Sequence, residues 1–514
     1  MAMDNDLTRK QQEWVDYILR PESDGAALLA VEMGLGKTRT GLMFAREYKA
    51  STILVCVPLQ TMDDWAKEAA VQLPNLPVRV IKSKPGSDRV ENLAAFQWRE
   101  SGIYLITHQY WEKLAWVLEP VKKRRKTDPD RTRKVDSGVW GGPGYTLIFD
   151  ESHRSANVDS WTHKALMNLD PRVFKLSMSG TFMGDKFDGA YGATRWLWPH
   201  RTDIIPGNIF SWRKIWAETA YDPFAPRKEK VVGELSEGAF VSALPCYIRM
   251  ESDLPKPIVH ELKIDLYPEQ RRVYDELDDL MVAWIENNPL EVEYSITKRA
   301  RQRQTTLAMP TLTFSKDPDT GIEELESVSF ADDAESAKID RLMLEIEGKG
   351  TLGDLLAGEA LLILTDSQLF ARLLTTRLND KYGYVAREWS GKVTKPQRKI
   401  VKQQFIDGEI QFLVGVQAAM GTGTDGLQHA SNIVVMMSKA DRRIDNEQGI
   451  ARLNRKGQTK QVHLVNMIAK DTVDTGQHSK QMEDALKMQR SLKAKHRKEQ
   501  RERERELRAL SHVQ

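Results

Sequence analysis

The sequence has little cysteine, almost no net charge and no long apolar run. Cys56 and Cys246 are the only cysteines among 514 residues, which excludes a secreted disulfide framework and argues against a zinc module. The formal net charge is +2, so contact with nucleic acid would depend on local basic clusters. No apolar stretch approaches the roughly 18 residues of a membrane span, and the polar first ten residues resemble no signal peptide. We therefore expect a soluble, cytoplasmic protein without a membrane partner.

What the chain does have is length and a balanced composition. With 41% hydrophobic and 29% charged residues, it is long enough for about two to four domains with well-packed cores.

The segment AVEMGLGKT at 30–38 has the layout of a phosphate-binding loop. An apolar run at 26–31 predicts a buried parallel strand, and a helical pattern follows at 38–48. A glycine turn between a strand and a helix start is the usual site for a bound phosphate. The generic motif has glycine where this chain has Val31, so the match is imperfect.

Each residue of this turn has an expected role in binding ATP. Gly34, Leu35 and Gly36 would present backbone N–H groups to phosphate oxygens. Lys37 would reach the β- and γ-phosphates, and the hydroxyl of Thr38 would bind magnesium.

A second apolar strand, at 145–149, runs directly into Asp150 and Glu151. In a hydrolytic nucleotide-binding protein the first carboxylate holds magnesium and the second accepts a proton from the attacking water. The alternative is an ordinary acidic pair at a turn. Further strands at 51–58, 103–107 and 173–178 end in polar or turn residues. This alternation of strands and helices predicts a doubly wound parallel sheet of the α/β class.

A second α/β series begins at Glu359 and has no phosphate loop, which indicates a second lobe without its own nucleotide site. We expect its strands at 361–365, 385–389, 411–416, 433–437 and 462–468. Near its end Arg452 and Arg455 are three residues apart, so on a helix they would share one face. Two guanidinium groups there could stabilise charge on a transferred phosphoryl group. A solvated basic helix is the alternative.

Taken in order, the motifs resemble the superfamily-two helicases, and most closely the Swi/Snf branch of DNA translocases. The first lobe carries EMGLGKT, VPLQTMDDW, DESHRSAN and SMSGT, and the second carries QGIARLNRKGQ. The resemblance implies two RecA-like lobes of a P-loop NTPase, with ATP and magnesium between them. It also implies that Gln11 reads adenine, that Gln448 belongs to the nucleotide site, and that Pro58, Thr107 and Thr422 follow DNA phosphates. The chain departs from the pattern at GTGTDGL, one residue out of register with the family's Gly-x-Gly-Leu-Asn-Leu.

From these motifs we expect five parts: a first lobe, a helical protrusion, an inter-lobe bridge with an insertion, a second lobe and a charged helical tail, at 1–185, 186–250, 251–350, 351–475 and 476–514. We expect the four tryptophans between 196 and 216 to form a small core. The basic run 122–126 could contact DNA phosphates or belong to a solvated loop, and 311–330 looks like a β-hairpin. The tail is a candidate site for a protein partner.

The function we expect is ATP-dependent translocation along duplex DNA by a helicase-like hydrolase. A strand-separating helicase and a slow nucleotide-switched scaffold on DNA are the alternatives. A compact motor without targeting modules would suit a bacterial or phage protein.

Overall fold

The structure is a computed structural model, which describes residues 8–32, 35–59, 61–81, 100–120, 132–140, 145–184, 186–222, 228–250, 254–279, 282–285, 288–291, 295–316, 323–420 and 426–476. These residues form two compact units that divide after residue 252. Gly34, Thr422, the basic run 122–126 and the tail beyond residue 476 lie outside the described residues.

The first unit is built on a parallel sheet, as the sequence predicts. In the described residues its strand order is β11-β1-β8-β7-β2-β4-β3, and every pairing between them is parallel. Its central strands are continuous buried apolar runs, the pattern of strands covered on both faces. The strands are β1 (Ala26–Val31), β2 (Thr52–Val57), β3 (Val78–Val80), β4 (Gly102–Thr107), β7 (Thr146–Asp150), β8 (Phe174–Met178) and β11 (Tyr247–Met250).

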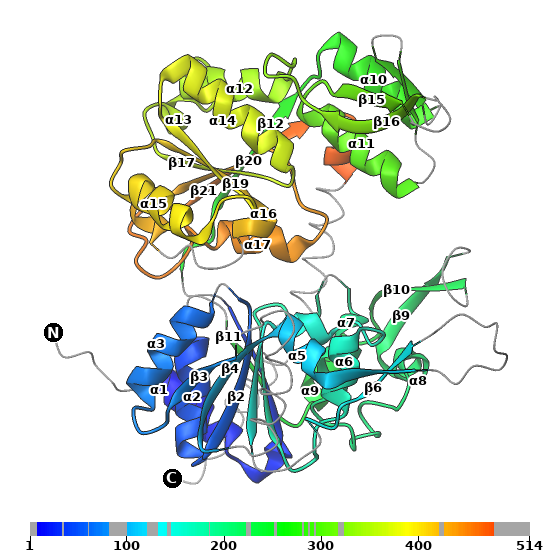
Figure 1. Cartoon of the computed structure of the whole chain (residues 1–514), viewed down its shortest axis with the longest axis vertical. Helices are drawn as coiled ribbons and strands as arrows, with labels where there is room; N and C mark the ends of the chain where they lie inside the picture. The colour runs from blue at the N-terminus through cyan, green and yellow to red at the C-terminus, as the bar shows by residue number, and fades with distance from the viewer. Residues whose placement is uncertain are drawn as a thin grey trace, which may run out of the picture. The chain divides into compact units, whose positions relative to one another are not determined.

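Helices cover both faces of this sheet (Figure 1). On one side lie α1 (Arg9–Ile18), α2 (Lys37–Glu47) and α3 (Met62–Gln72), and on the other lie α5 (His108–Ala115), α6 (Trp161–Met167) and α7 (Gly189–Arg195). Helices α8 (Ile209–Trp216) and α9 (Ala239–Ala243) lie in the range 186–250, which belongs to the same compact unit and also contains sheet strand β11, so a separate helical protrusion stays a prediction.

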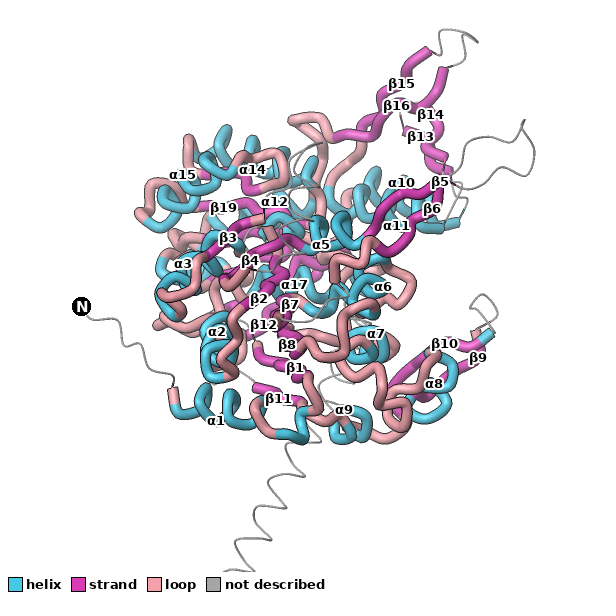
Figure 2. Tube along the Cα trace, turned by 60° about the horizontal axis from the view of Figure 1, so that its bottom comes forward, coloured by secondary structure: helices cyan, strands magenta, loops and turns pink. Residues whose placement is uncertain are grey.

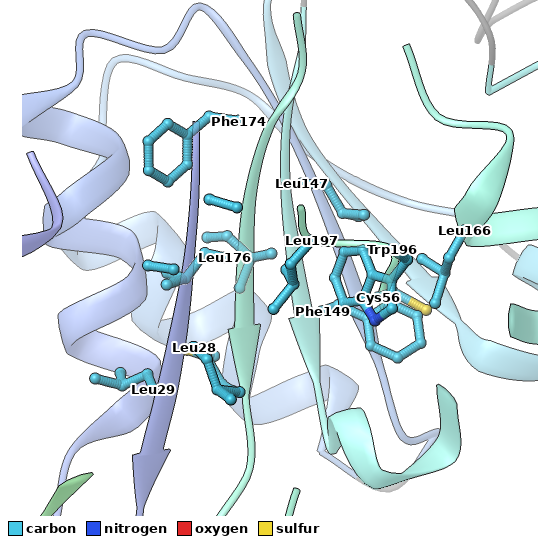
Figure 3. Packing of buried hydrophobic residues seen from close by; sticks show 14 of the residues in the cluster. Leu28, Leu29, Cys56, Leu147, Phe149, Leu166, Phe174, Leu176, Trp196 and Leu197 are labelled. Atoms are coloured by element: carbon cyan, nitrogen blue, oxygen red, sulfur yellow. The ribbon is translucent and has the colours of Figure 1, made fainter. Parts of the chain in front are cut away.

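The predicted tryptophan core is confirmed for three of its four residues, while Trp216 is partly buried, and the cluster is continuous with the core of the sheet. Trp196, Trp198 and Trp212 are fully buried. Figure 3 shows Trp196 beside Phe149 and Cys56, and its ring lies edge-on to Phe149 with centroids 5.7 Å apart. Burial raises the pKa of the Cys56 thiol well above its usual value, so this cysteine is a packing residue and not a nucleophile.

Two antiparallel hairpins extend from the first unit. The flanks of the predicted basic insertion pair as β5 (Trp116–Pro120) and β6 (Thr132–Asp136), whereas the basic run itself lies outside the described residues, so both interpretations of that run stay predictions. Aromatic and β-branched residues at Trp116, Val117 and Val135 favour this pairing. The second hairpin, β9 (Ala217–Tyr221) and β10 (Glu229–Glu234), follows α8 (Figure 2).

The second unit is a second parallel sheet, with order β12-β21-β20-β17-β19-β18 in the described residues. All five strands predicted after residue 359 are present. The strands are β12 (Ile258–Ile264), β17 (Leu361–Thr365), β18 (Ala386–Trp389), β19 (Phe412–Val416), β20 (Ile433–Met436) and β21 (His463–Ala469). Around them lie α12 (Ala337–Ile346), α13 (Gly353–Leu356), α14 (Gln368–Tyr382), α15 (Lys395–Ile406), α16 (Gln417–Met420) and α17 (Arg443–Ile450). The two units therefore confirm the α/β, doubly wound fold class.

The segment between β12 and α12 packs within the second unit. It contains α10 (Pro268–Asp279), α11 (Ser295–Leu307) and two hairpins, β13 (Val282–Ile285) with β14 (Asn288–Glu291) and β15 (Thr311–Lys316) with β16 (Glu323–Ser329). The hairpin expected at 311–330 is confirmed. A helical pattern runs from Glu269 to Trp284 in the sequence, but α10 ends at Asp279 because the apolar run that follows pairs as β13. No helix in the described ranges is long and apolar enough to cross a membrane.

Candidate nucleotide-hydrolysis site

The phosphate loop of the first unit ends in a residue that must be glycine. Gly36 caps the N-terminus of α2 with φ +80° and ψ 30°, a left-handed conformation that side chains with a Cβ rarely adopt. A Cβ built on Gly36 would lie 2.5 Å from Gln11 Nε2. Both the backbone conformation and the neighbouring side chain therefore disfavour any larger residue.

The close neighbour, Gln11, is held beside the loop by a capping box at the start of α1. Its Oε1 accepts from the backbone N and the hydroxyl of Thr8, at 3.0 and 3.1 Å. Its side-chain amide nitrogen is then the group that lies against Gly36. Gln11 is only 7% exposed, so it is not a solvated helix residue. The role in reading adenine remains a prediction.

Lys37 presents a buried ammonium group without an acceptor. Among the described residues its Nζ has no hydrogen-bond partner. A buried cation left unpaired costs free energy, and phosphate oxygens would supply the missing acceptors. The charge of Lys37 acts on both Asp150 and Glu151, and a Cβ on Gly180 would lie 4.0 Å from its Nζ. The loop lysine, the carboxylates and the turn after β8 therefore converge within one unit.

Asp150 and Glu151 are both buried at the end of β7, but their pKa values are shifted in opposite directions. Burial, and then the charge of Glu151, raises the pKa of Asp150. For Glu151 burial also acts upward, but a hydrogen bond from His153 and the charge of Lys37 outweigh it and lower its pKa. Glu151 has φ 54° and ψ 52°, a strained conformation for a residue with a side chain, of the kind that clusters at functional sites.

His153 links Glu151 to the turn after β8. Its Nδ1 lies 3.2 Å from Glu151 Oε2 and 3.5 Å from Ser179 Oγ, and Ser179 Oγ in turn accepts from the backbone N of Thr181. The sequence contains both motifs, DESH and SGT, but nothing local to either assigns His153 this contact.

The predicted magnesium ligands suit that ion chemically. Thr38 is the second residue of α2, and Asp150 ends β7. A hydroxyl and a carboxylate are oxygen donors of the kind Mg²⁺ prefers, and Mg²⁺ usually keeps several waters and phosphate oxygens. In the described part of the chain no group of three or more His, Cys, Asp or Glu could hold a metal, which is compatible with such a sparse site.

Two side chains that the sequence did not single out hold Asp150 in place. Trp65 Nε1 donates to its Oδ2 at 3.2 Å, and His108 Nε2 donates to its backbone oxygen at 2.7 Å. Burial, with the charge of Arg154, lowers the pKa of His108 to about 3, so its ring is neutral. These residues are 85 and 42 positions from Asp150 in the chain.

The predicted DNA-tracking positions of the first unit lie at strand ends. Pro58 follows β2, is buried, and its carbonyl accepts from the backbone N and hydroxyl of Thr61. Having no N–H, it could not donate to a phosphate itself, so contact at this turn would fall to exposed neighbours. Thr107 ends β4, and its hydroxyl caps α5 by accepting from Tyr110 N at 3.2 Å.

In the second unit, the arginine pair does not lie on a helix, and that prediction is wrong. Helix α17 ends at Ile450, and Arg452 and Arg455 lie in the turns that follow. Arg452 is 6% exposed and its Nε donates to the backbone oxygen of Gln448 at 3.2 Å. Arg455 is half-buried. The spacing of the two arginines is a property of the local sequence. The position at which α17 ends depends also on the turns that follow it, which include Gly457 at φ +95°.

A phosphate loop beside an Asp-Glu strand end, within a doubly wound parallel sheet, defines the P-loop NTPase class. Comparison with known families agrees: residues 10–315 match the SNF2-related domain. That match covers more than half of the 514 residues, and the chain belongs to this family, as the motif resemblance predicts.

Similarity to individual proteins is low but extensive. The chain is 27% identical over 237 residues to "Transcription regulatory protein SNF2" of Saccharomyces cerevisiae, covering 45% of this chain and 12% of that protein. It is 22% identical to "Uncharacterized ATP-dependent helicase YqhH" of Bacillus subtilis, covering 88% of this chain and 73% of that protein. A solved structure, "Sulfolobus solfataricus SWI2/SNF2 ATPase core in complex with dsDNA", aligns over 91% of this chain and 89% of its own, with 16% identity and a TM-score of 0.37.

Proposed function

We propose that this protein is a DNA-dependent ATPase whose hydrolysis cycle drives movement along duplex DNA. The nucleotide-binding part of the proposal depends on the buried ammonium of Lys37, which has no hydrogen-bond partner within the described ranges and whose charge acts on a carboxylate pair of the same unit. Membership of the SNF2-related family supports the motor part, together with relatives named as ATP-dependent helicases.

Each candidate site residue of the first unit would have one task in hydrolysis. Gly36 would let the loop backbone approach the phosphates, Lys37 would neutralise the β- and γ-phosphate oxygens, and Gln11 would pair with the base. Thr38 and Asp150 would hold Mg²⁺, which supplies further charge neutralisation. Glu151 would orient the attacking water and take its proton as the water oxygen bonds to the γ-phosphorus and the bond from that phosphorus to the β–γ bridging oxygen breaks, which releases ADP and phosphate.

The second unit would complete the site when ATP brings the two units together. Arg455, the more exposed of the two arginines, would stabilise charge on the transferred phosphoryl group. Buried Arg452 would brace the backbone at Gln448. Closure with ATP and opening after hydrolysis make a two-state hinge. Alternating grips on DNA, at Thr107 and the turn after Pro58 in one unit and near Thr422 in the other, would convert that hinge into steps.

Of the two candidate motor activities, we favour movement along duplex DNA without separation of its strands. Unwinding needs a rigid wedge where strands part, and the hairpin β15–β16 is a poor one because its sequence at 317–326 (DPDTGIEELE) is acidic and would repel a duplex junction. A strand-separating helicase is the second candidate, favoured by the names of the relatives. The charged tail remains the predicted place for a protein partner.

The test measures ATPase activity on single-stranded, duplex and forked DNA, with displacement of a triplex-forming strand and unwinding of a fork. Stimulation by duplex and ATP-dependent triplex displacement, with little fork unwinding, are expected, and Lys37→Ala should abolish all three activities. Efficient unwinding with the triplex strand left in place would establish the helicase, and an ATPase indifferent to DNA would establish the slow scaffold.

A further inference from the structure

Asp150, the proposed magnesium carboxylate, is held by hydrogen bonds from two different helices. Trp65 on α3 donates its indole N–H to the carboxylate Oδ2 at 3.2 Å. His108 on α5 lies 2.7 Å from the backbone oxygen of the same residue. Since a carbonyl oxygen only accepts, His108 must donate through Nε2–H. One helix therefore orients the side chain of Asp150, and the other fixes the backbone that carries it.

Both helices begin at the strand ends proposed to follow DNA. Helix α3 starts with the turn after Pro58, where Thr61 binds the Pro58 carbonyl and its own carbonyl accepts from Trp65 N at 2.9 Å. Trp65 is thus one helical turn from that site. Helix α5 is capped by Thr107, and His108 is the next residue. A shift of either turn would therefore move a donor that touches Asp150.

The tight packing around Trp65 and His108 would transmit such a shift to Asp150. Trp65 is 1% exposed and His108 is 4% exposed. The His108 ring packs edge-on against Phe149, the residue before Asp150, with centroids 5.0 Å apart and planes at 77°. Buried side chains at crystal-like density have no free space in which to absorb a displacement.

We propose that Trp65 and His108 are positioning residues that couple DNA contact, at the turn after Pro58 and at Thr107, to the placement of Asp150. DNA binding would set the two donors, and the donors would set the carboxylate in the orientation that hydrolysis needs. The proposal rests on the proposed function, because it requires an ATPase that DNA stimulates. It adds residues on α3 and α5 through which that stimulation passes.

The test separates the hydrogen bonds from ordinary packing. Trp65→Phe removes the indole N–H and keeps an aromatic ring, and His108→Phe removes the imidazole donor. His108→Gln keeps an N–H donor and should restore function in part. Trp111→Phe is the matched control, because Trp111 is a fully buried tryptophan on α5 that also packs on Phe149, and its indole N has no hydrogen-bond partner among the described residues.

The measurement is the ratio of the turnover number with saturating duplex DNA to that without DNA. DNA affinity, the Mg²⁺ concentration for half-maximal rate and the melting temperature are measured alongside. We expect the ratio to fall about 2- to 10-fold in Trp65→Phe and in His108→Phe, the range for one lost hydrogen bond. The Mg²⁺ requirement should rise, and DNA affinity should hold. Trp111→Phe should keep the wild-type ratio.

Several results would overturn the coupling. One is an unchanged ratio in both variants while wild type is stimulated by DNA. Another is an equal loss of basal and stimulated rates, which would make the residues supports of the site and not couplers. A ratio that falls as much in Trp111→Phe would assign the effect to packing. If His108→Phe does not fold, His108→Gln replaces it in the comparison. A ratio of stimulated to unstimulated turnover that is lower in His108→Gln than in Trp65→Phe would then refute a donor role for His108. Failure of the proposed function is distinct, because wild type itself would then show no stimulation.

Discussion

Replacing Gly36 with alanine should weaken ATP binding far more than it weakens the fold. The left-handed backbone at φ +80° costs an alanine about 1–2 kcal/mol. The new Cβ would lie 2.5 Å from Gln11 Nε2, so Gln11 must leave its place. The contacts of Gln11 with Thr8 are then lost, and a broken helix cap costs about 0.5–2 kcal/mol. If the total of about 1.5–4 kcal/mol falls on the binding-competent loop, affinity drops roughly 10- to 700-fold.

The matched control for this prediction is Gly25→Ala. Gly25 has φ +72°, and a Cβ at this position would have no heavy atom within 4 Å, so alanine there meets the same backbone cost without a clash. Titration of a fluorescent ATP analogue should give wild-type affinity for Gly25→Ala and much weaker binding for Gly36→Ala. The melting temperature should fall in both variants, and further in Gly36→Ala because only this variant also loses the contacts of Gln11 with Thr8. Wild-type affinity in Gly36→Ala would refute the contact between Gln11 and the loop.

Three other substitutions test separate features. Glu151→Gln should still bind ATP and DNA but hydrolyse very slowly in single-turnover assays, because an amide cannot take the proton of water; loss of ATP binding would indicate a structural role. Arg455→Ala should cut hydrolysis by about 10³–10⁵ with affinity little changed, and an equal loss of both would mean that it binds only the ground state. Lys175→Met should stabilise the fold by roughly 1–3 kcal/mol at pH 7, because burial lowers the pKa of Lys175 from 10.5 to about 8. Below pH 8 Lys175 is charged in both the folded and the unfolded protein, so the full cost of burying the charge applies. Between pH 8 and 10.5 only the folded protein loses the proton, so wild type gains stability as the pH rises. The stability difference between wild type and Lys175→Met should therefore shrink in melting curves. A difference independent of pH would contradict this reasoning.

Strand positions followed well from the sequence because the central strands of both sheets, such as β1, β2, β17 and β19, are continuous buried apolar runs. Strands β1 and β17 have the predicted bounds, and the other strands predicted for the two sheets differ by one residue at one or both ends. Errors occurred where tertiary pairing competes with a helical pattern. The helical pattern that reaches Trp284 stops at Asp279, where the run that follows pairs as β13, and α17 ends at Ile450, before the arginine motif. The helical spacing of apolar residues carries no information about a partner strand that is distant in the chain.

The amino-acid order alone determined the class of this protein, since a glycine turn before Lys37 and a strand before Asp150 are local patterns with a direct chemical meaning. Which side chains meet at the site was decided only by the tertiary structure. Parallel strands bring their carboxyl ends to one edge of a sheet, and that edge gathers Trp65, His108 and His153 around the acidic pair. Burial lowers the pKa of His108, the packing of α1 places Gln11 beside Gly36, and the Lys37 ammonium finds no acceptor in the part of the chain that the structure describes. None of these follows from spacing, because each depends on contacts between segments that lie far apart along the chain.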